Sequence, residues 1–253
     1  WTRDLTALFD KRILGLVNYV LRRRYRLHEQ YLKNALPRIR ALEPDVVVCT
    51  GDLTCVGSPE EFQRANRKLK TLIDNPGADF LYVPGNHDAY VSRPSCRRGL
   101  AETFHRVNRE RWPLDGLPVR LDTAHAHFFL VNESRPTRIV DSCGFIDDET
   151  ASRLERWFAE ERSDAAPRFL IGHFPTRRPD GTELPPRRRL HGASVIRRAL
   201  TDGSLDVSLC GHIHDPFLHK EERGGLEICA GSLTMGGKLN VLDIDPESHR
   251  ISQ

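Results

Sequence analysis

Four apolar runs in this chain each end at a glycine that is directly followed by a polar side chain suited to binding a metal ion. Uninterrupted apolar runs of this length are typical of strands buried on both faces of a sheet. Glycine lets the backbone turn sharply beyond each strand, and ligands of open α/β sheets bind at the carboxyl ends of the strands. The runs therefore predict one cluster of side chains at that edge. They are VVVCTGD with Asp52, FLYVPGNHD with Asn86, His87 and Asp88, FLIGHF with His173, and LCGHIH with His212 and His214.

Each motif alone also has a purely structural interpretation. Gly-Asp after a strand is common turn chemistry, and Asn-His-Asp after Pro-Gly can be a turn that exposes polar groups. A lone histidine after a strand is more often a hydrogen-bonded turn residue, whereas strand alternation would place His212 and His214 on one side. The combination favours a functional site, because all four motifs follow glycine at strand ends and supply oxygen or nitrogen ligands.

The order of elements predicts the fold class. Helices alternate with strands in the first half of the chain and strands dominate the end, which indicates a one-domain α/β sandwich with a mixed sheet. A proline at position 37 is expected to kink or divide the second helix. We expect helices over 11–26, 29–42, 58–73, 97–111, 148–162 and 193–200, and strands within 45–52, 79–83, 119–122, 125–134, 168–174, 206–214, 226–232 and 238–245.

The first helical stretch, residues 11–26, is amphipathic and basic. Its apolar residues fall on one helical face and arginines close it; they are Ile13, Leu16, Val17, Val20 and Leu21, followed by Arg22, Arg23, Arg24 and Arg26. The interpretation that we favour is packing of the apolar face on the core. Peripheral contact of residues 11–26 with a membrane, or with an anionic ligand, is the alternative.

Composition excludes some classes of protein. No apolar run approaches the roughly 20 residues of a membrane-spanning helix, and the formal charge of +3 is too small to indicate a nucleic-acid-binding module. The six cysteines show no C-x-x-C spacing, which predicts reduced thiols in a cytoplasmic protein. The chain starts at Trp1 and its only methionine is Met235, so we expect a natural N-terminus upstream.

The ordered motifs resemble the calcineurin-like metallophosphoesterase family. GDLT, GNHD, GHFP and GHIH match that family's second to fifth motifs in order, from Gly51 to His214. The resemblance implies a metallophosphoesterase-like α/β sandwich with mixed β-sheets flanked by helices. It also implies a hydrolase that cleaves a phosphomonoester or phosphodiester through attack of a metal-bound hydroxide.

The resemblance further implies a binuclear centre with two divalent metal ions. Asp52 would bridge both ions, Asn86, His173 and His212 would complete one site, and His214 would serve the other. Mixed nitrogen and oxygen ligation suits Mn, Fe, Zn or Co without choosing among them.

The same resemblance implies catalytic roles for two neighbouring residues. His87 would not ligate metal but would hydrogen-bond the phosphoryl group and protonate the leaving oxygen as general acid. Asp88 would orient the His87 imidazole and favour its charged form.

One motif of the family is absent. Its first motif, D-x-H on the first strand, should supply an Asp and a His to the His214 site, and nothing before Asp52 replaces it. We expect this strand upstream of Trp1, so that residues 1–253 form a single domain without it, holding one ion well and the other poorly. A non-catalytic metal-binding or scaffold member of the same fold is the alternative.

The loop TRRPDGTELPPRRRLHG begins just after His173. Its arginines suit recognition of anionic substrate groups, although a solvated loop is the simpler interpretation; they are Arg177, Arg178, Arg187, Arg188 and Arg189. The phosphoester substrate stays open among nucleotides, cyclic nucleotides, phospholipid headgroups and phosphoproteins.

Overall fold

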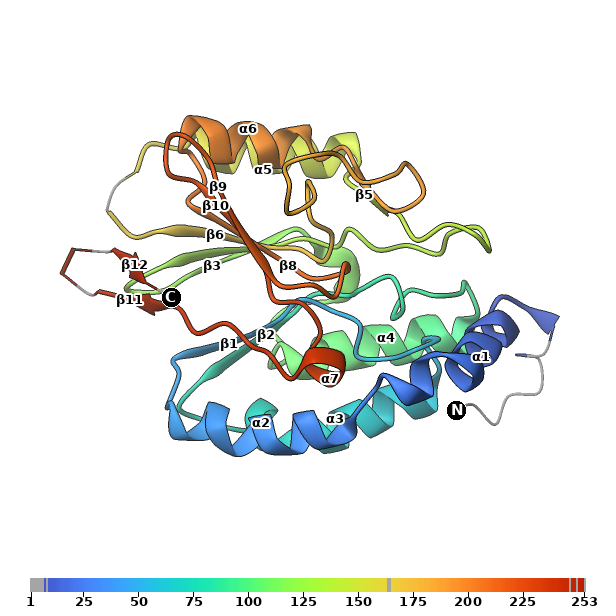
Figure 1. Ribbon diagram of the computed structural model, residues 1–253. Helices are drawn as coiled ribbons and strands as arrows, with labels where there is room; N and C mark the ends of the chain where they lie inside the picture. Colours follow the sequence, from blue (N-terminus) through green and yellow to red (C-terminus); the bar gives the residue numbers. More distant parts are fainter. Residues whose placement is uncertain (1–6, 8, 163–164, 246, 249, 253) are drawn as a thin grey trace.

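The computed structural model describes the whole chain except residues 1–6, 8, 163–164, 246, 249 and 253, so Trp1 lies outside the described residues. The predicted alternation of helices and strands is present (Figure 1). Two sheets lie face to face between two layers of helices, which confirms the predicted α/β sandwich.

The larger sheet has six strands and is mixed. Its four central strands, β4, β6, β8 and β10, are parallel, and β3 and β9 pair antiparallel at its two edges. In spatial order the strands are β3 (Val119–Asp122), β4 (His127–Leu130), β6 (Arg168–Ile171), β8 (Val207–Cys210), β10 (Leu226–Cys229) and β9 (Phe217–Lys220).

The second layer is a parallel pair, β1 (Val46–Cys49) and β2 (Asp79–Tyr82). Leu81 and Val83 pack against Phe128, Phe169 and other residues of the larger sheet and thereby join the two layers. Two short ladders lie outside this sandwich: β5 (Gly144–Phe145) with β7 (Leu190–His191), and β11 (Asp243–Ile244) with β12 (Ile251–Ser252).

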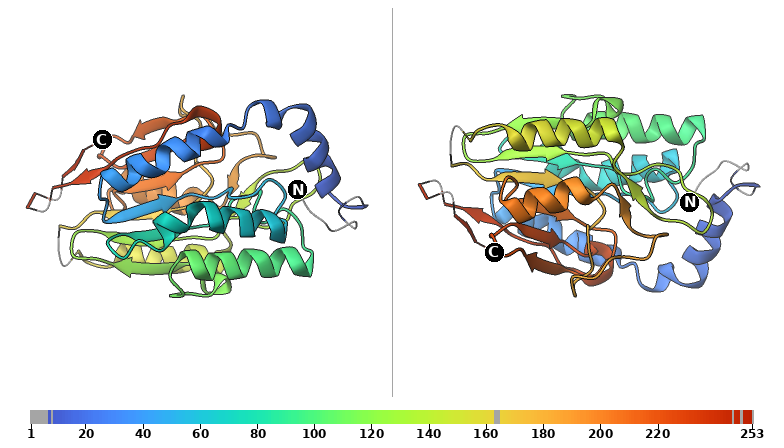
Figure 2. Two further views of the ribbon diagram at one scale, coloured as in Figure 1. Left: turned by 90° about the horizontal axis from the view of Figure 1, so that it is seen from below. Right: turned by 90° about the horizontal axis from the view of Figure 1, so that it is seen from above.

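Helices cover both outer faces of the sandwich. In Figure 1, α5 and α6 lie over the larger sheet and α2, α3 and α4 lie under β1 and β2, while Figure 2 shows α1 at one end of the molecule. The helices are α1 (Arg12–Leu21), α2 (Glu29–Ala41), α3 (Pro59–Ile73), α4 (Pro94–Val107), α5 (Asp148–Ala159), α6 (Ser194–Asp202) and α7 (Leu233–Gly236), with 3₁₀ turns η2 (Arg23–Tyr25) and η3 (Leu114–Gly116).

The start of α3 follows from its sequence. The Ser58 hydroxyl accepts the backbone N–H of Glu61, and the Glu61 carboxylate accepts the backbone N–H of Ser58. Pro59 occupies the first helical position, where its missing N–H costs nothing. This capping box directs the chain from the end of β1 into the helical layer.

Three local predictions are corrected. All four residues of β1 are only partly buried, because β1 pairs with β2 alone within the described residues. The second helix runs through Pro37 without division. Strands β5, β7, β9 and β12 and helix α7 were not predicted, because their sequences contain neither a long apolar run nor a helical period. The prediction of a further strand upstream of Trp1 stays a prediction.

The prediction that residues 11–26 pack their apolar face on the core is wrong for most of that face. The helix ends at Leu21, and Val17, Val20 and Leu21 are 46%, 39% and 67% exposed, whereas Ile13 and Leu16 are half-buried. None of the described helices is both long and apolar enough to cross a bilayer. All six cysteines lie among the described residues, and none of them forms a disulfide.

Candidate metal centre

Four of the five predicted ligands meet where the two sheets come together. Asp52 and Asn86 follow strands of the smaller sheet, whereas His173 and His212 follow strands of the larger one. The Asn86 Oδ1 atom lies 3.1 Å from His173 Nε2 and 2.9 Å from His212 Nδ1. Asp52 Oδ1 lies 3.7 Å from His173 Nε2. The site is therefore built between two sheets rather than along the edge of one.

Two glycines allow this close approach. Gly51 has a φ of 106°, which a residue with a side chain rarely adopts. A Cβ atom on Gly85 would lie 2.1 Å from Asp52 Oδ1 and 2.7 Å from His173 Cε1. Neither position can carry a larger residue without displacing a side chain of the cluster.

The two histidines after β8 do not alternate as strand residues. The strand ends at Cys210, and His212 and His214 have φ angles of 64° and 62°. Left-handed backbone at non-glycine residues is strained and is often retained at functional sites. The prediction that strand alternation places both side chains together is wrong, and the tight turn directs only His212 toward Asn86.

The contacts of His173 show that hydrogen-bond acceptor atoms face one another in this site. Its Nδ1 atom donates to the carbonyl oxygen of Thr50 at 2.6 Å, because a carbonyl can only accept. A neutral ring then presents a lone pair at Nε2 to two oxygens, Asn86 Oδ1 and Asp52 Oδ1. Acceptors facing acceptors repel one another unless a cation or a proton lies between them.

The spacing of these atoms fits a metal ion. Ligand atoms bound about 2.1 Å from one ion lie about 3.0 Å apart in octahedral geometry and about 3.4 Å apart in tetrahedral geometry. The distances of 3.1 Å and 2.9 Å from Asn86 Oδ1 to the two imidazoles are close to the octahedral value. In addition, His212 Nε2 is a buried polar atom without a hydrogen-bond partner among the described residues.

The charge states also suit a cation. Burial acts to raise the pKa of Asp52, but the imidazoles of His173 and His87 and the His87 backbone N–H outweigh it and lower the pKa to about 2. Burial and the neighbouring His173 lower the pKa of His212 well below its usual range. At neutral pH the cluster thus holds a carboxylate and a neutral imidazole, the protonation states that metal binding requires.

The amide of Asn86 is essential to this arrangement. If only His, Cys, Asp and Glu are counted, no group of three within the described chain is placed to hold a metal ion.

His214 is half-buried, and no hydrogen bond or ion pair joins it to the other four among the described residues. Burial lowers the pKa of His214, and the nearby charges of Arg23 and Arg188 lower it further despite Asp52.

His87 lies beside the cluster and contacts a residue that the sequence did not single out. Its backbone N–H donates to Asp52 Oδ1 at 2.9 Å. Its ring Nδ1 lies 2.8 Å from the carbonyl oxygen of Cys55, and Arg23 Nη2 donates to its Nε2 at 2.7 Å. The ring stacks on Tyr90 with centroids 5.6 Å apart. Burial lowers the pKa of His87 to about 4, and the Arg23 charge contributes to this shift.

Asp88 does not orient the His87 imidazole, and that prediction is wrong. Its buried carboxylate accepts hydrogen bonds from the backbone N–H groups of Leu53, Thr54 and Gly85 and from the hydroxyls of Thr54 and Tyr82. Burial and the nearby Asp52 raise the pKa of Asp88 to about 6. Asp88 therefore joins the ends of β1 and β2, and the Cys55 carbonyl orients the His87 ring.

Two buried glutamates hold the loop that carries His173. Glu133 Oε2 accepts the backbone N–H groups of His173 and Phe174, each at 2.7 Å. Glu227 accepts the N–H of Thr176 at 2.7 Å and its hydroxyl at 3.0 Å. The sequence signal for both was a lone acid within an apolar strand run, FFLVNES and LEICAGS. For Arg23, no sequence feature distinguished it from the neighbouring arginines.

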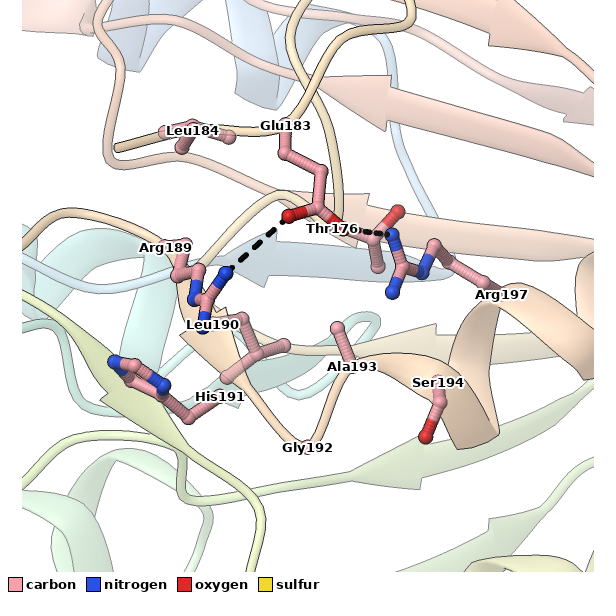
Figure 3. A pocket seen from close by; sticks show the side chains of 10 residues that line it. All are labelled: Thr176, Glu183, Leu184, Arg189, Leu190, His191, Gly192, Ala193, Ser194 and Arg197. Atoms are coloured by element: carbon pink, nitrogen blue, oxygen red, sulfur yellow. Dashed lines mark hydrogen bonds and ion pairs between the residues drawn. The ribbon is translucent and has the colours of Figure 1, made fainter. Parts of the chain in front are cut away.

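Three of the five predicted loop arginines pair with carboxylates. Arg177 pairs with Glu221 at 2.6 Å, Arg187 with Asp141 at 3.9 Å and Arg189 with Glu183 at 3.2 Å, whereas Arg178 is exposed without such a partner among the described residues. Figure 3 shows a pocket of about 200 Å³ in which Glu183 lies between Arg189 and Arg197. None of the four residues that meet at the candidate metal site lines this pocket. Arg188 is exposed and has no carboxylate partner among the described residues.

The family of this chain is identified by its sequence similarity to known proteins. The family model described as calcineurin-like phosphoesterase matches residues 26–216, well over half of the chain. The chain belongs to the calcineurin-like phosphoesterase family. This calcineurin-like phosphoesterase also shares its fold with a dimetal phosphatase from Danio rerio. The TM-score is 0.59 and the identity 17%, and the match covers 88% of this chain and 81% of that one.

Two curated relatives are phosphodiesterases by name. A cAMP/cGMP dual specificity phosphodiesterase, MT0825 from Mycobacterium tuberculosis, is 26% identical over 68% of this chain and 49% of its own length. The glycerophosphodiester phosphodiesterase GpdQ of Enterobacter lignolyticus is 26% identical over 68% of this chain and 56% of its own length. This calcineurin-like phosphoesterase thus spans about half the length of the curated relatives that it matches.

Proposed function

We propose that this chain is a metal-dependent phosphoester hydrolase in which Asp52, Asn86, His173 and His212 hold a divalent cation. The observation that carries the proposal is the convergence of three acceptor atoms: His173 Nε2 lies 3.1 Å from Asn86 Oδ1 and 3.7 Å from Asp52 Oδ1, and His212 Nδ1 lies 2.9 Å from the same amide oxygen. When bound, Mn, Fe, Zn or Co ions would supply Lewis acidity that polarises a phosphoryl oxygen and acidifies water.

The neighbouring side chains suit binding of the phosphoryl group. Arg23 and His87 lie in contact beside Asp52, and Arg23 has no carboxylate partner among the described residues. A guanidinium that is not neutralised binds phosphate oxygens through paired N–H groups. We assign phosphoryl binding to Arg23. We assign to His87 proton transfer to the leaving oxygen. For this, Nε2 must first release Arg23 and take up a proton from solvent, which loss of the adjacent Arg23 charge favours, and the ring returns to its neutral form when that proton passes to the leaving oxygen.

A phosphodiester is the substrate class that we propose, because both named relatives are phosphodiesterases. The position of His214 also limits the number of ions. Since no hydrogen bond or ion pair among the described residues joins His214 to the other four ligands, we propose that this chain holds one ion tightly and a second weakly through Asp52 and His214.

A non-catalytic metal-binding protein is the second candidate. It is favoured by the lack of a hydrogen bond or ion pair between His214 and the other four ligands in the described part of the chain, and by the contact of Arg23 with His87 Nε2. Both features would be compatible with bound metal and no turnover.

Metal content and turnover measured together separate these candidates. The chain would be loaded with Mn or Zn, dialysed, analysed for metal and assayed with bis-p-nitrophenyl phosphate and p-nitrophenyl phosphate. His173→Ala should lose both metal and turnover, whereas His125→Ala, an exposed histidine in the turn before β4, should lose neither. Metal without turnover in the wild-type chain would favour the second candidate, and wild-type protein that retains no metal would refute both.

A further inference from the structure

Helix α1 turns four of its apolar side chains away from the protein, whereas Ile13 and Leu16 are half-buried. Its small and charged residues face the domain: a Cβ atom on Gly15 would lie 2.3 Å from the Val56 side chain and 3.3 Å from the Tyr90 hydroxyl. Arg12 is fully buried and pairs with Asp10 at 2.8 Å. Amphipathic surface helices of soluble domains normally have the opposite orientation.

Polar anchors hold the helix in this orientation. Lys11 Nζ donates to Thr137 Oγ1 at 3.0 Å and to the carbonyl of Asp141 at 3.3 Å, and it lies 4.7 Å from the centre of the Tyr90 ring. Asp10 also accepts from Arg93 at 3.1 Å. The orientation is therefore set by contacts that do not involve the apolar residues.

The outward residues form a contiguous apolar surface. Leu14, Val17, Val20 and Leu21 are 45%, 46%, 39% and 67% exposed, and their spacing of three, six and seven residues places them on one helical face. We call these four residues the α1 face. Single exposed apolar residues are ordinary, whereas a clustered set at one end of the molecule marks a binding surface (Figures 1 and 2).

The α1 face is bordered by positive charge. Arg22, Arg24 and Arg26 follow it directly, all are exposed, and none has a carboxylate partner in the described part of the chain. Residues 11–28 contain no Asp or Glu. Such a border would repel the same surface on a second copy and complements an anionic one. Apolar side chains with arginines at their edge suit the boundary between lipid headgroups and acyl chains.

We propose that the α1 face and Arg22, Arg24 and Arg26 form a docking surface for an anionic lipid bilayer. The helix lies in the plane of the interface, with the four apolar side chains inserted and the arginines on lipid phosphates. This surface goes beyond the proposed hydrolysis and does not depend on it, since vesicle binding is measured without substrate or metal.

Vesicle flotation of the 253-residue chain tests the proposal. We expect binding to vesicles that contain phosphatidylglycerol and little binding to pure phosphatidylcholine. Val17→Asp with Leu21→Asp should lower the vesicle-bound fraction about tenfold, as should Arg22→Ala with Arg24→Ala and Arg26→Ala. Sodium chloride at about 1 M, which shortens the screening length to about 3 Å, should weaken binding as well.

Leu42→Asp is the matched control, because Leu42 is 54% exposed at the end of α2, outside the α1 face. It should bind vesicles like the wild type. All variants alter exposed side chains, so thermal melting should match the wild type and exclude unfolding as the cause of lost binding. The proposal is overturned if anionic vesicles are not bound, if both lipids bind equally, or if sedimentation equilibrium reveals a dimer that Val17→Asp with Leu21→Asp dissociates.

Discussion

Replacing Arg23 by alanine should raise the pKa of His87. The Arg23 guanidinium donates to His87 Nε2 at 2.7 Å, and burial together with this charge lowers the pKa of His87 to about 4. Two unit charges 4 Å apart near a protein surface interact by about 4 kcal/mol. Because Arg23 is partly exposed, screening leaves about a third of this energy, which corresponds to about one pKa unit.

The sign follows from the charges. Arg23 disfavours the imidazolium, so its removal makes the ring easier to protonate and moves the pKa from about 4 upward toward the ordinary value of 6.5. Long-range ¹H–¹⁵N correlation spectra of the protein in EDTA would follow both ring nitrogens between about pH 3 and pH 8. The spectra would also test the tautomer, since the Cys55 carbonyl requires the proton on Nδ1.

Two matched variants distinguish a local charge effect from a general one. Arg23→Lys retains the charge and should keep the pKa of His87 low, whereas Arg24→Ala removes an exposed neighbouring charge with no contact to His87. If His87 titrates alike in wild type and Arg23→Ala, or if Arg24→Ala shifts it equally, the contact between Arg23 and His87 does not govern the ring.

Three further predictions concern the cluster and its supports. Asn86→Ala removes the oxygen that contacts both imidazoles and should weaken Zn²⁺ binding about a hundredfold in a chelator competition assay; unchanged affinity would exclude Asn86 as a ligand. Gly85→Ala places a Cβ atom 2.1 Å from Asp52 Oδ1 and should lower the free energy of unfolding by about 1–3 kcal/mol in urea. Gly236→Ala, with no atom within 4 Å of the new Cβ, should not. Burial raises the folded-state pKa of Glu227 from 4.5 to about 7, so its contribution is fully present below about pH 4.5 and is lost as the pH rises through about 7, by about 3 kcal/mol in total. Glu227→Gln should remove this share of the pH dependence of unfolding, and an unchanged pH profile would contradict the buried-acid interpretation.

Patterns that act over a few residues were predictable from the sequence. The capping box at Ser58 and Glu61 defines the start of α3 by hydrogen bonds within one helical turn. The apolar runs before Asp52, Asn86, His173 and His212 become strands β1, β2, β6 and β8, because strand formation depends on local propensity and burial. The position of these four residues after the carboxyl ends of strands followed from the general rule for α/β sheets, whereas their division between two sheets did not.

Contacts between distant segments were not predictable. Arg23 lies 64 residues from His87, and no periodicity distinguishes it from Arg22 or Arg24. Asp88 adjoins His87 in the chain, yet its carboxylate contacts the end of β1, because side chains of neighbouring residues in a turn point in different directions.

The sequence by itself determined the fold class, most strands and helices, and the four side chains that meet at the candidate metal site. Only the tertiary structure decided that α1 carries most of its apolar face outward, that His214 shares no hydrogen bond or ion pair with those four among the described residues, and that Glu133 and Glu227 hold the His173 loop. The physical reason is that periodicity reveals which face of a helix is apolar but not what covers it. Lys11, which donates to Thr137, and Arg12, which donates to Cys96 Sγ, decide that for α1 through polar contacts to distant residues.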